Sequence, residues 1–569
     1  MGDAPARVEA SDAATAALDR FFEVFYRQRP VSATFTGLHA HDGVLPDWSA
    51  EGVARSADDM RTLRRDLDQA GRVRDDAVTE FPAQVDLALA DAALEIALAE
   101  HESGHFVHRN PTMWTGEAIF GVLSLLTRDF APLRQRLDHA RQRLEAMPRF
   151  LADAFSVLRD APRGWRDRAI RECQAGGMLL AETLPAWVGA QAVEAGYGGA
   201  SAWRAAAVDA AEALAGFGAH LATHGPDVPE HAGTDLLALL VRRGHWVSQP
   251  LDALLAEATD ALDEAAARLE TMARAHGGWA AVQDLLAAEH PTAERYLARF
   301  DEKWRACWQA AHDYRLVTWP MAPLRYVPIP AHTRDAATHL YYLHYRSPAP
   351  FDSLAMFDYV VPPLDGLSGE SLEARLRAVN DSVITLNHVV HHGAIGHHVQ
   401  NHHAYRGRSR IGAVAAVDTA NRIAMFPGGS LAEGWACYVC DLMEEVGFLT
   451  PLERIAQQHT RVRIAARAVA DLSLHTGRLT VAEAASIYTD RAGMSPAAAL
   501  GESVRNSMYP ATAVMYWLGT RGLHRLRAEM WGRQGGAFSM RAFHDRVLSY
   551  GAIPVALISQ LMLADEAER

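Results

Sequence analysis

The sequence predicts a large, mainly α-helical protein with a small β element, and three observations support this fold class. Apolar residues recur at helical spacing through most of the 569 residues, which is the pattern of helices with one buried face. Ala, Leu, Arg and Glu, all favourable in helices, dominate the composition. A proline-bearing stretch from Trp319 to Leu367 interrupts the periodicity and includes aromatic and β-branched runs.

The N-terminal part, residues 1–318, is predicted to be a helical lobe. Helical periodicity is clearest in four segments, to which no function is assigned: 85–98, 133–158, 203–221 and 251–272. The C-terminal part, residues 319–569, is predicted to be a second helical lobe that carries the chemistry. We expect the two lobes to form one continuous structural unit, because length alone does not establish independent domains.

Two segments of the proline-bearing stretch are expected to form short strands. They are Leu324–Ile329 and His339–Tyr345, both rich in aromatic and β-branched residues. We expect this small β element to lie near the active-site cleft, where an edge strand can hold an extended substrate.

The overall charge excludes several classes of partner. A formal net charge of -14 argues against nucleic-acid binding, which needs a basic surface, and against binding to anionic membranes.

The sequence contains no apolar window long enough for a membrane span. The acidic N-terminal residues do not resemble a signal peptide, and four cysteines are too few for a disulfide scaffold. These features favour a cytoplasmic enzyme.

Histidines are concentrated between residues 388 and 403. Seven of the 27 histidines lie in these 16 residues. Imidazole is the commonest metal ligand in proteins, so this density predicts a metal site. The seven are His388, His391, His392, His397, His398, His402 and His403.

Helix geometry leaves two ways to build the site. In a straight helix, residues four apart share a face, so His388 with His392, or His398 with His402, can chelate one ion. His391 and His398 also share a face but lie ~10 Å apart along the axis, which is too far for bonds of about 2.0 Å to one zinc ion. They converge only if the helix breaks at Gly393 or Gly396, and glycine tolerates such a break.

Several motifs resemble those of the DUF885 family of peptidase-like metalloproteins. The segment 391–400, HHGAIGHHVQ, is similar to the family pattern H-E-x-x-P-G-H-H-x-Q, and 433–440, EGWACYVC, is similar to E-G-W-A-L-Y-x-E. Further similarities follow in family order over nearly the whole chain: 30–37 with His41-Asp42; Arg467, Asp471 and His475; Glu502 and Arg505; and 543–545 ahead of Leu548 and Gly551. The resemblance implies a large two-lobed, metallopeptidase-like helical fold.

The resemblance also implies a ligand set. His391 and His397 would be the first and second ligands, with His398 as the alternative second ligand, and Glu433 would be the third. This is a gluzincin-like arrangement with one position open for water or substrate. The implied cofactor is one divalent transition metal, zinc first and iron second.

Two departures from the family pattern affect the chemistry. His392 replaces the glutamate that serves as general base toward water in such sites, and Cys440 replaces a second glutamate. Imidazole acts as a base near neutral pH, so His392 is a candidate base. It is equally a candidate ligand, and a histidine-rich site suits iron or copper as well as zinc.

Other residues are candidates for catalysis near the metal. Asp471 and His475 share a helix face and are expected to form either a proton-shuttling pair or a buried structural hydrogen bond. Arg505 is expected to hold a substrate carboxylate or to pair with Glu502 in its own helix. Tyr509, and with less support Tyr516, offer hydroxyl groups.

Three functions remain open from the sequence. The first is metal-dependent hydrolysis of a small amide, peptide or ester, so that the partner is a small molecule or short peptide. The second is a non-hydrolytic tailoring enzyme that uses the metal as a Lewis acid or redox centre in a biosynthetic pathway. The third, with the least support, is a catalytically inactive binding protein.

Overall fold

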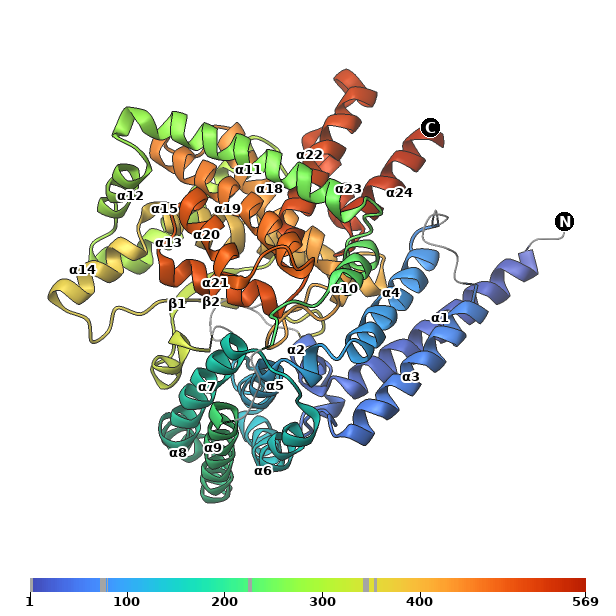
Figure 1. The fold of residues 1–569 in the computed structure, drawn as a ribbon, viewed down its shortest axis with the longest axis vertical. Helices are drawn as coiled ribbons and strands as arrows, with labels where there is room; N and C mark the ends of the chain where they lie inside the picture. Colours follow the sequence, from blue (N-terminus) through green and yellow to red (C-terminus); the bar gives the residue numbers. More distant parts are fainter. Residues whose placement is uncertain are drawn as a thin grey trace. The chain divides into compact units, whose positions relative to one another are not determined.

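The computed structural model describes residues 4–71, 78, 80–223, 228–340, 347–352 and 356–568. In these ranges helices predominate, and two short strands form a single sheet. The prediction of a mainly α fold with a small β element is confirmed (Figure 1). Among the described helices, none has the length and apolar character that crossing a bilayer requires.

Contacts divide the chain into two units, each built from separate stretches of sequence. The first unit comprises 1–229, 329–355 and 417–424, and the second comprises 230–328, 356–416 and 425–569. The predicted lobes, 1–318 and 319–569, have a different boundary from these contact units. Residues 230–318 belong to the second unit, and the segments 329–355 and 417–424 belong to the first. The division into two lobes at that boundary stays a prediction.

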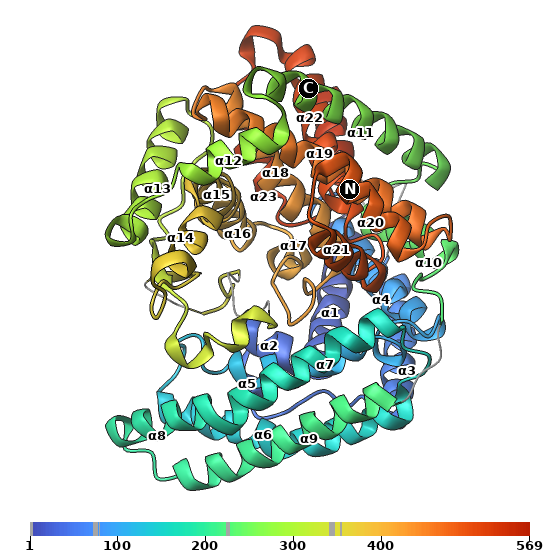
Figure 2. The ribbon, with the colours of Figure 1, turned by 60° about the vertical axis from the view of Figure 1, so that its left-hand side comes forward.

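The first unit is a helical array in which α9 packs against both α6 and α7, as Figures 1 and 2 show in teal and green. Its buried centre includes Trp114, Trp165 and Trp203. Its helices are α1 (Ala4–Gln28), α2 (Pro30–Thr36), α3 (Ala50–Gln69), α4 (Ala83–Glu102), α5 (Pro111–Leu123), α6 (Leu133–Val157), α7 (Arg163–Met178), α8 (Leu184–Ala195) and α9 (Ala200–Thr223). Single turns are η1 (His39–His41), η3 (Phe106–His108), η4 (Leu179–Thr183), η8 (Ala331–Thr333) and η9 (Ala336–Thr338).

Residues distant in sequence complete the first unit. The guanidinium of Arg422 donates to both carboxylate oxygens of Glu100, at 2.8 and 3.2 Å. Glu100 is almost fully buried. A buried carboxylate is costly without a partner, so the segment 417–424 supplies a charge that the first 229 residues need.

The second unit contains the histidine cluster. Its first elements are α10 (Thr234–Leu239), η5 (Leu240–Gly244), α11 (Leu251–Ala273), η6 (Arg274–His276), α12 (Trp279–Ala288), η7 (Ala293–Arg295), α13 (Tyr296–Asp313), β1 (Leu324–Pro328), β2 (Phe357–Val361), α14 (Gly369–Ala378), α15 (Asp381–Val383), η11 (Ile384–Gly393), α16 (His397–Ala404) and α17 (Arg410–Val414). The remainder are η12 (Phe426–Gly428), α18 (Gly429–Glu445), α19 (Pro451–His475), α20 (Val481–Ala492), α21 (Pro496–Met508), α22 (Val514–Gln534), η13 (Gly535–Ala537), α23 (Met540–Ser549) and α24 (Val555–Glu568).

Two glycines allow α18 and α22 to pack with their backbones in contact. A Cβ added at Gly519 of α22 would lie 1.9 Å from the carbonyl oxygen of Ser430 and 2.7 Å from Cα of Gly434, both in α18. Any larger residue would force the helices apart. This close approach brings Glu433 of α18 near Tyr516 of α22, and Figure 2 shows both helices beside α19.

The sheet confirms one expected strand, and most of the other falls outside the described residues. β1 pairs in parallel with β2, with Tyr326 opposite Tyr359 in the register, so the strand expected at Leu324–Ile329 is present. The second strand was expected at His339–Tyr345. His339 and Leu340 follow the turn η9 and are not in a strand, and 341–345 lie outside the described residues. Instead, the partner strand is β2, which also carries aromatic and β-branched residues.

Candidate metal centre

The first part of the histidine cluster lies in a widened helix. Asn380 caps the start of α15, its side chain accepting from the backbone N–H groups of Ser382 and Val383. The chain then continues as the π-helix η11. π-Helical turns are rare and often occur at functional sites. Tyr326 of β1 donates to the carbonyl of His388 at 3.2 Å, so the small sheet supports this helix directly.

The helix breaks between Gly393 and Gly396, as the resemblance implied. The N–H of Gly396 donates to the carbonyl of Val390 at 2.9 Å. A Cβ at position 396 would lie 1.8 Å from the carbonyl oxygen of His391, so only glycine fits this close approach. Helix α16 begins immediately afterwards at His397. The break brings the ring of His397 close to those of His391 and His392.

Four side chains converge at this break. One ring nitrogen from each of His391, His392 and His397 lies within 4.8 Å of the other two. Oε2 of Glu433 lies 3.6 Å from Nε2 of His391 and 3.5 Å from Nε2 of His397. The structure therefore places the three expected ligands together and adds His392 to them.

His398, the alternative second ligand, lies outside this group. It is fully buried, and its Nε2 donates to the carbonyl of Ala322 at 2.8 Å. Two other clustered histidines also have separate partners: Nδ1 of His388 lies 3.0 Å from the hydroxyl of Tyr359, and His403 bonds the carbonyl of Thr318 at 2.7 Å. Of these two neighbouring histidines, His397 has its ring beside His391 and His392, whereas the ring of His398 is bound to Ala322.

The protonation states of His391, His392 and Glu433 suit metal binding. Burial lowers the pKa of His391 and lowers that of His392 well below its usual value. Both rings are therefore neutral near pH 7, as a ligand must be. Burial alone would raise the pKa of Glu433, but the imidazoles of His397 and His391 hold it well below its usual value. The carboxylate is therefore ionised.

The backbone selects the tautomer of His392. Its Nδ1 lies 2.8 Å from the carbonyl oxygen of Asn387, and a carbonyl can only accept a hydrogen bond. Nδ1 therefore carries the proton, and Nε2 keeps a lone pair. Such a carbonyl partner commonly orients a metal-binding histidine.

The donor types suit a transition-metal ion, and two of the distances match such a site. Ligands at about 2.1 Å from a tetrahedral ion lie about 3.4 Å from one another, and the distances from Glu433 to His391 and His397 are 3.6 and 3.5 Å. The three ring nitrogens lie within 4.8 Å of one another. The side chains of His391, His397 and Glu433 keep 12 to 19% of their surface exposed. A small molecule can therefore reach the group.

Asp471 and His475 make buried contacts with backbone groups. The carboxylate of Asp471 accepts from the N–H groups of Ala511 and Val514, at 3.1 and 2.8 Å. Nε2 of His475 donates to the carbonyl of Asn506 at 3.0 Å. Both side chains are fully buried. The pair holds the connection from α21 to α22 against α19, and its proposed part in proton transfer stays a prediction.

Arg505 and Tyr509 lie on and just after α21. Glu502 of that helix accepts from Arg467 of α19 at 2.6 Å, and the charge of Arg505 also acts on Glu502. From the sequence, only Arg505 is a candidate partner of Glu502, and the structure adds Arg467 of α19. Tyr509 follows α21 and is buried; neither residue belongs to the four converging groups, and their catalytic roles stay predictions.

The thiols near Glu433 are neutral. Burial, with a contribution from the charge of Glu433, raises the pKa of Cys437, and burial raises that of Cys440 well above its usual value. Cys440 donates to the carbonyl of Ala436 at 3.3 Å. Among the described residues, the group whose ligand atoms lie together comprises His391, His392 and His397 and includes neither cysteine.

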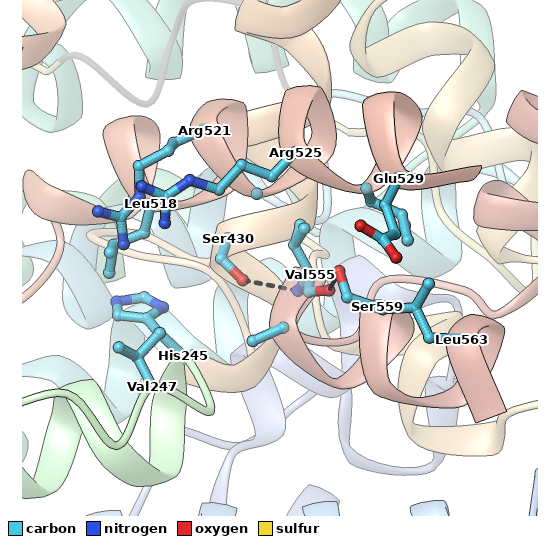
Figure 3. Close-up of a pocket in the computed structure, with 13 residues that line it drawn as sticks. His245, Val247, Ser430, Leu518, Arg521, Arg525, Glu529, Val555, Ser559 and Leu563 are labelled. Carbon is cyan, nitrogen blue, oxygen red and sulfur yellow. Dashed lines mark hydrogen bonds between the residues drawn. The ribbon is translucent and has the colours of Figure 1, made fainter. Parts of the chain in front are cut away.

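A separate hollow lies in the second unit. Figure 3 shows this pocket of about 360 Å³, where Arg521 and Arg525 of α22 lie above His245 and Ser430, and Val555 begins α24. None of the four converging residues lines it. This pocket is therefore separate from the candidate metal centre.

The fold and the converging groups define a class: a mainly helical protein with a histidine- and carboxylate-lined centre at a helix break. The family model "Bacterial protein of unknown function (DUF885)" matches residues 30–562. The chain therefore belongs to the DUF885 family. No curated protein matches it by sequence.

Two solved structures share the fold over almost the full chain. The first is a presumed lipoprotein of unknown function from Shewanella oneidensis, with a TM-score of 0.74 and 20% identity, covering 97% of this chain and 99% of the other. The second is a presumed lipoprotein from Colwellia psychrerythraea, with a TM-score of 0.72 and 15% identity, covering 98% and 99%. At these identities the similarity establishes the fold.

Proposed function

We propose that this protein is a metal-dependent enzyme that hydrolyses an amide, peptide or ester bond in a small molecule or short peptide. The supporting observation is the convergence of His391, His392, His397 and Glu433 at a partly open position. Neutral imidazoles with a carboxylate suit a divalent transition ion in a gluzincin-like site. Zinc is the first expectation and iron the second.

The chain's own residues hold and orient this site. A divalent ion there would polarise a carbonyl group and make water more acidic. Glu433 supplies negative charge, because its pKa is held well below its usual value. Trp304 donates to the carbonyl of Gly393 at 2.8 Å, which, with the bond from Tyr326 to His388, fixes the backbone on either side of His391.

Only one ring nitrogen of His392 can serve a metal ion or a proton. Because Nδ1–H is bound to Asn387, only Nε2 is available to a ligand or a proton. His392 can therefore bind the ion or act as base, but it cannot do both at once. Its inclusion among the converging ring nitrogens favours the role of ligand.

A non-hydrolytic reaction is the second candidate. The observation that favours it is the third imidazole at the position where a hydrolase of this kind would carry its general base. Three histidines and a carboxylate also suit iron. An oxygen-dependent reaction of an iron-loaded protein would support this alternative, whereas oxygen-independent hydrolysis with zinc would support the first.

Elemental analysis of the purified protein tests the proposal. We expect about one equivalent of zinc or iron in the wild type and its loss in His391→Ala and Glu433→Ala. His403→Gln is the matched control, because His403 belongs to the same sequence cluster but bonds Thr318. Turnover of dipeptides, N-acyl amino acids and small esters then tests hydrolysis. A folded wild type that takes up no transition metal overturns the proposal, and so does a metal-loaded protein that hydrolyses none of the three classes.

The proposed partners are a small-molecule or short-peptide substrate, without nucleic acid or membrane. A cytoplasmic location follows from the sequence argument. The presumed lipoprotein character of the two similar structures supplies the alternative, because lipoproteins are exported and anchored. Fractionation of the native cells decides between them: recovery with the cytoplasmic enzymes supports the first, and recovery with the membrane fraction the second.

A further inference from the structure

An arginine cluster lies beside the candidate metal centre. Arg463 and Arg467 are one turn apart on α19, and Arg505 comes from α21. The guanidinium of Arg467 lies 4.7 Å from the ring centre of Tyr516 and donates to Glu502 at 2.6 Å. The charges of all three arginines act on Glu502. These three arginines, called here the arginine cluster, therefore share one carboxylate.

The cluster surrounds an ionised carboxylate. Burial alone would raise the pKa of Glu502, but Arg467 and Arg505 lower it to about 2, so this carboxylate carries a full negative charge. Glu502 in turn raises the pKa of Arg467 despite its burial. The position therefore already holds one carboxylate among guanidinium groups, which is the contact that a substrate carboxylate would make.

Tyr516 connects the cluster to the metal centre. Its hydroxyl experiences the charges of Glu433 on one side and of Arg467 and Arg505 on the other. The charge of Arg467 also acts on His391. The side chains of Arg467 and Glu502 keep 17 and 15% of their surface exposed. The cluster is thus within electrostatic reach of the metal centre, and part of it is open to a bound molecule.

We infer that the arginine cluster binds a carboxylate of the substrate while the bond to be broken lies at the metal centre. The inference rests on the proposed function and specifies the substrate class: a molecule with a free carboxylate close to an amide or ester bond, such as an N-acyl amino acid or the C-terminal end of a short peptide. A guanidinium donates two parallel hydrogen bonds to a carboxylate.

Paired hydroxamates test the inference without knowledge of the natural substrate. A hydroxamate binds a metal ion directly, so its affinity reports the metal centre. The half-hydroxamates of succinic and glutaric acid add a carboxylate, and their methylamides are neutral counterparts. We expect the better charged ligand to bind the zinc-loaded protein at least about tenfold more tightly than its neutral counterpart, as expected for a hydrogen-bonded charge pair. Calorimetry measures both affinities.

Variants identify the residues responsible. Arg467→Gln and Arg505→Gln should each reduce the preference for the charged ligand several-fold while leaving the affinity of the neutral one unchanged. Arg454→Gln is the control, because Arg454 lies on the same helix but pairs with Glu444, and it should keep the full preference. Glu502→Gln should increase the preference, since it removes the competing carboxylate. Circular dichroism checks that each variant is folded.

The outcomes separate this inference from the proposed function. If both hydroxamates bind equally well to the zinc-loaded wild type, the carboxylate subsite is wrong and the metal centre stands. If the wild type binds neither zinc nor a hydroxamate, the proposed function fails and the inference fails with it. A preference that survives both arginine substitutions also overturns the assignment to this cluster.

Discussion

The indole N–H of Trp435 donates to the backbone carbonyl of Ile395 at 2.9 Å. Trp435 is two residues after Glu433 in α18, and Ile395 is two residues before His397 at the helix break. One hydrogen bond therefore ties the helix that carries the carboxylate to the segment that returns the imidazole. Both groups are fully buried, so this bond fixes the distance across the candidate metal centre.

Trp435→Phe should weaken both folding and metal binding. The substitution leaves the buried carbonyl of Ile395 without its donor, which costs about 1–3 kcal/mol, and loosens an element that positions two ligands, which typically lowers metal affinity about tenfold or more. Urea unfolding and zinc titration measure the two effects.

Trp114→Phe supplies the control for Trp435→Phe. Trp114 is also fully buried and donates to a backbone carbonyl, that of Val107, at 2.9 Å, but it belongs to the first unit. It should lose similar stability and keep its affinity for zinc. Equal zinc affinity in both variants would contradict the role given to Trp435.

Gly396→Ala should disrupt the site without opening a cavity. The added Cβ would meet the backbone of His391 and Val390, 1.8 and 2.6 Å away, so the break must change its path. We expect zinc affinity to fall at least about tenfold, as when ligand orientation is lost.

The control for the glycine substitution is Gly216→Ala. Gly216 is exposed in α9, and a Cβ there meets nothing within 4 Å, so this change should stabilise the helix by about 0.5–1 kcal/mol. Tight zinc binding by Gly396→Ala would show that the close approach at His391 is not required.

His392→Gln distinguishes a ligand from a base. If Nε2 of His392 binds the ion, the substitution lowers metal affinity and changes the visible absorption of the cobalt-substituted protein. We expect this result, because His392 is already among the converging nitrogens. Unchanged affinity and spectrum, together with lost turnover, would instead assign His392 as the base.

The first unit should lose stability at alkaline pH through His39. Hydrogen bonds to Asp352 and Asp42 raise the pKa of His39 from 6.5 to about 9. Because the folded pKa exceeds the unfolded one, the stabilisation is complete below pH 6.5 and is lost as pH rises through about 9. Urea midpoints of the wild type and His39→Gln across this interval measure it. The difference between the two proteins should shrink with rising pH, and a constant difference would contradict the prediction.

The helical class could be predicted from apolar spacing along the sequence. The glycines 393 and 396 made a helix break possible, but residue spacing left a straight helix open as well, and the family resemblance selected the break. The preference for His397 over His398 as a ligand came from the family resemblance. The two residues are adjacent on a helix, and the sequence does not show which of the two side chains points toward the site. That direction is set by distant partners such as Ala322, which accepts from His398.

Long-range pairings could not be predicted. The strand that pairs with β1 depends on tertiary packing, which the sequence pattern does not show. β2 lies in the proline-bearing stretch 319–367, whose composition indicated loops. Likewise, Arg463 gave no signal in the sequence, since an arginine in a helix is ordinarily solvated. Its place beside Glu502 depends on α19 packing next to α21, which residue spacing does not reveal.

The pairing of Glu100 with Arg422 has a consequence for synthesis of the chain. The two residues are separated by 322 positions, so Glu100 leaves the ribosome long before Arg422. Until then, the emerging N-terminal helices hold a buried carboxylate that has the charge of Arg29 nearby but lacks the arginine that forms hydrogen bonds with it. Nascent chains arrested before residue 422 should therefore resist proteases less well than those released after it, and expression of 1–229 alone should yield an incompletely folded fragment.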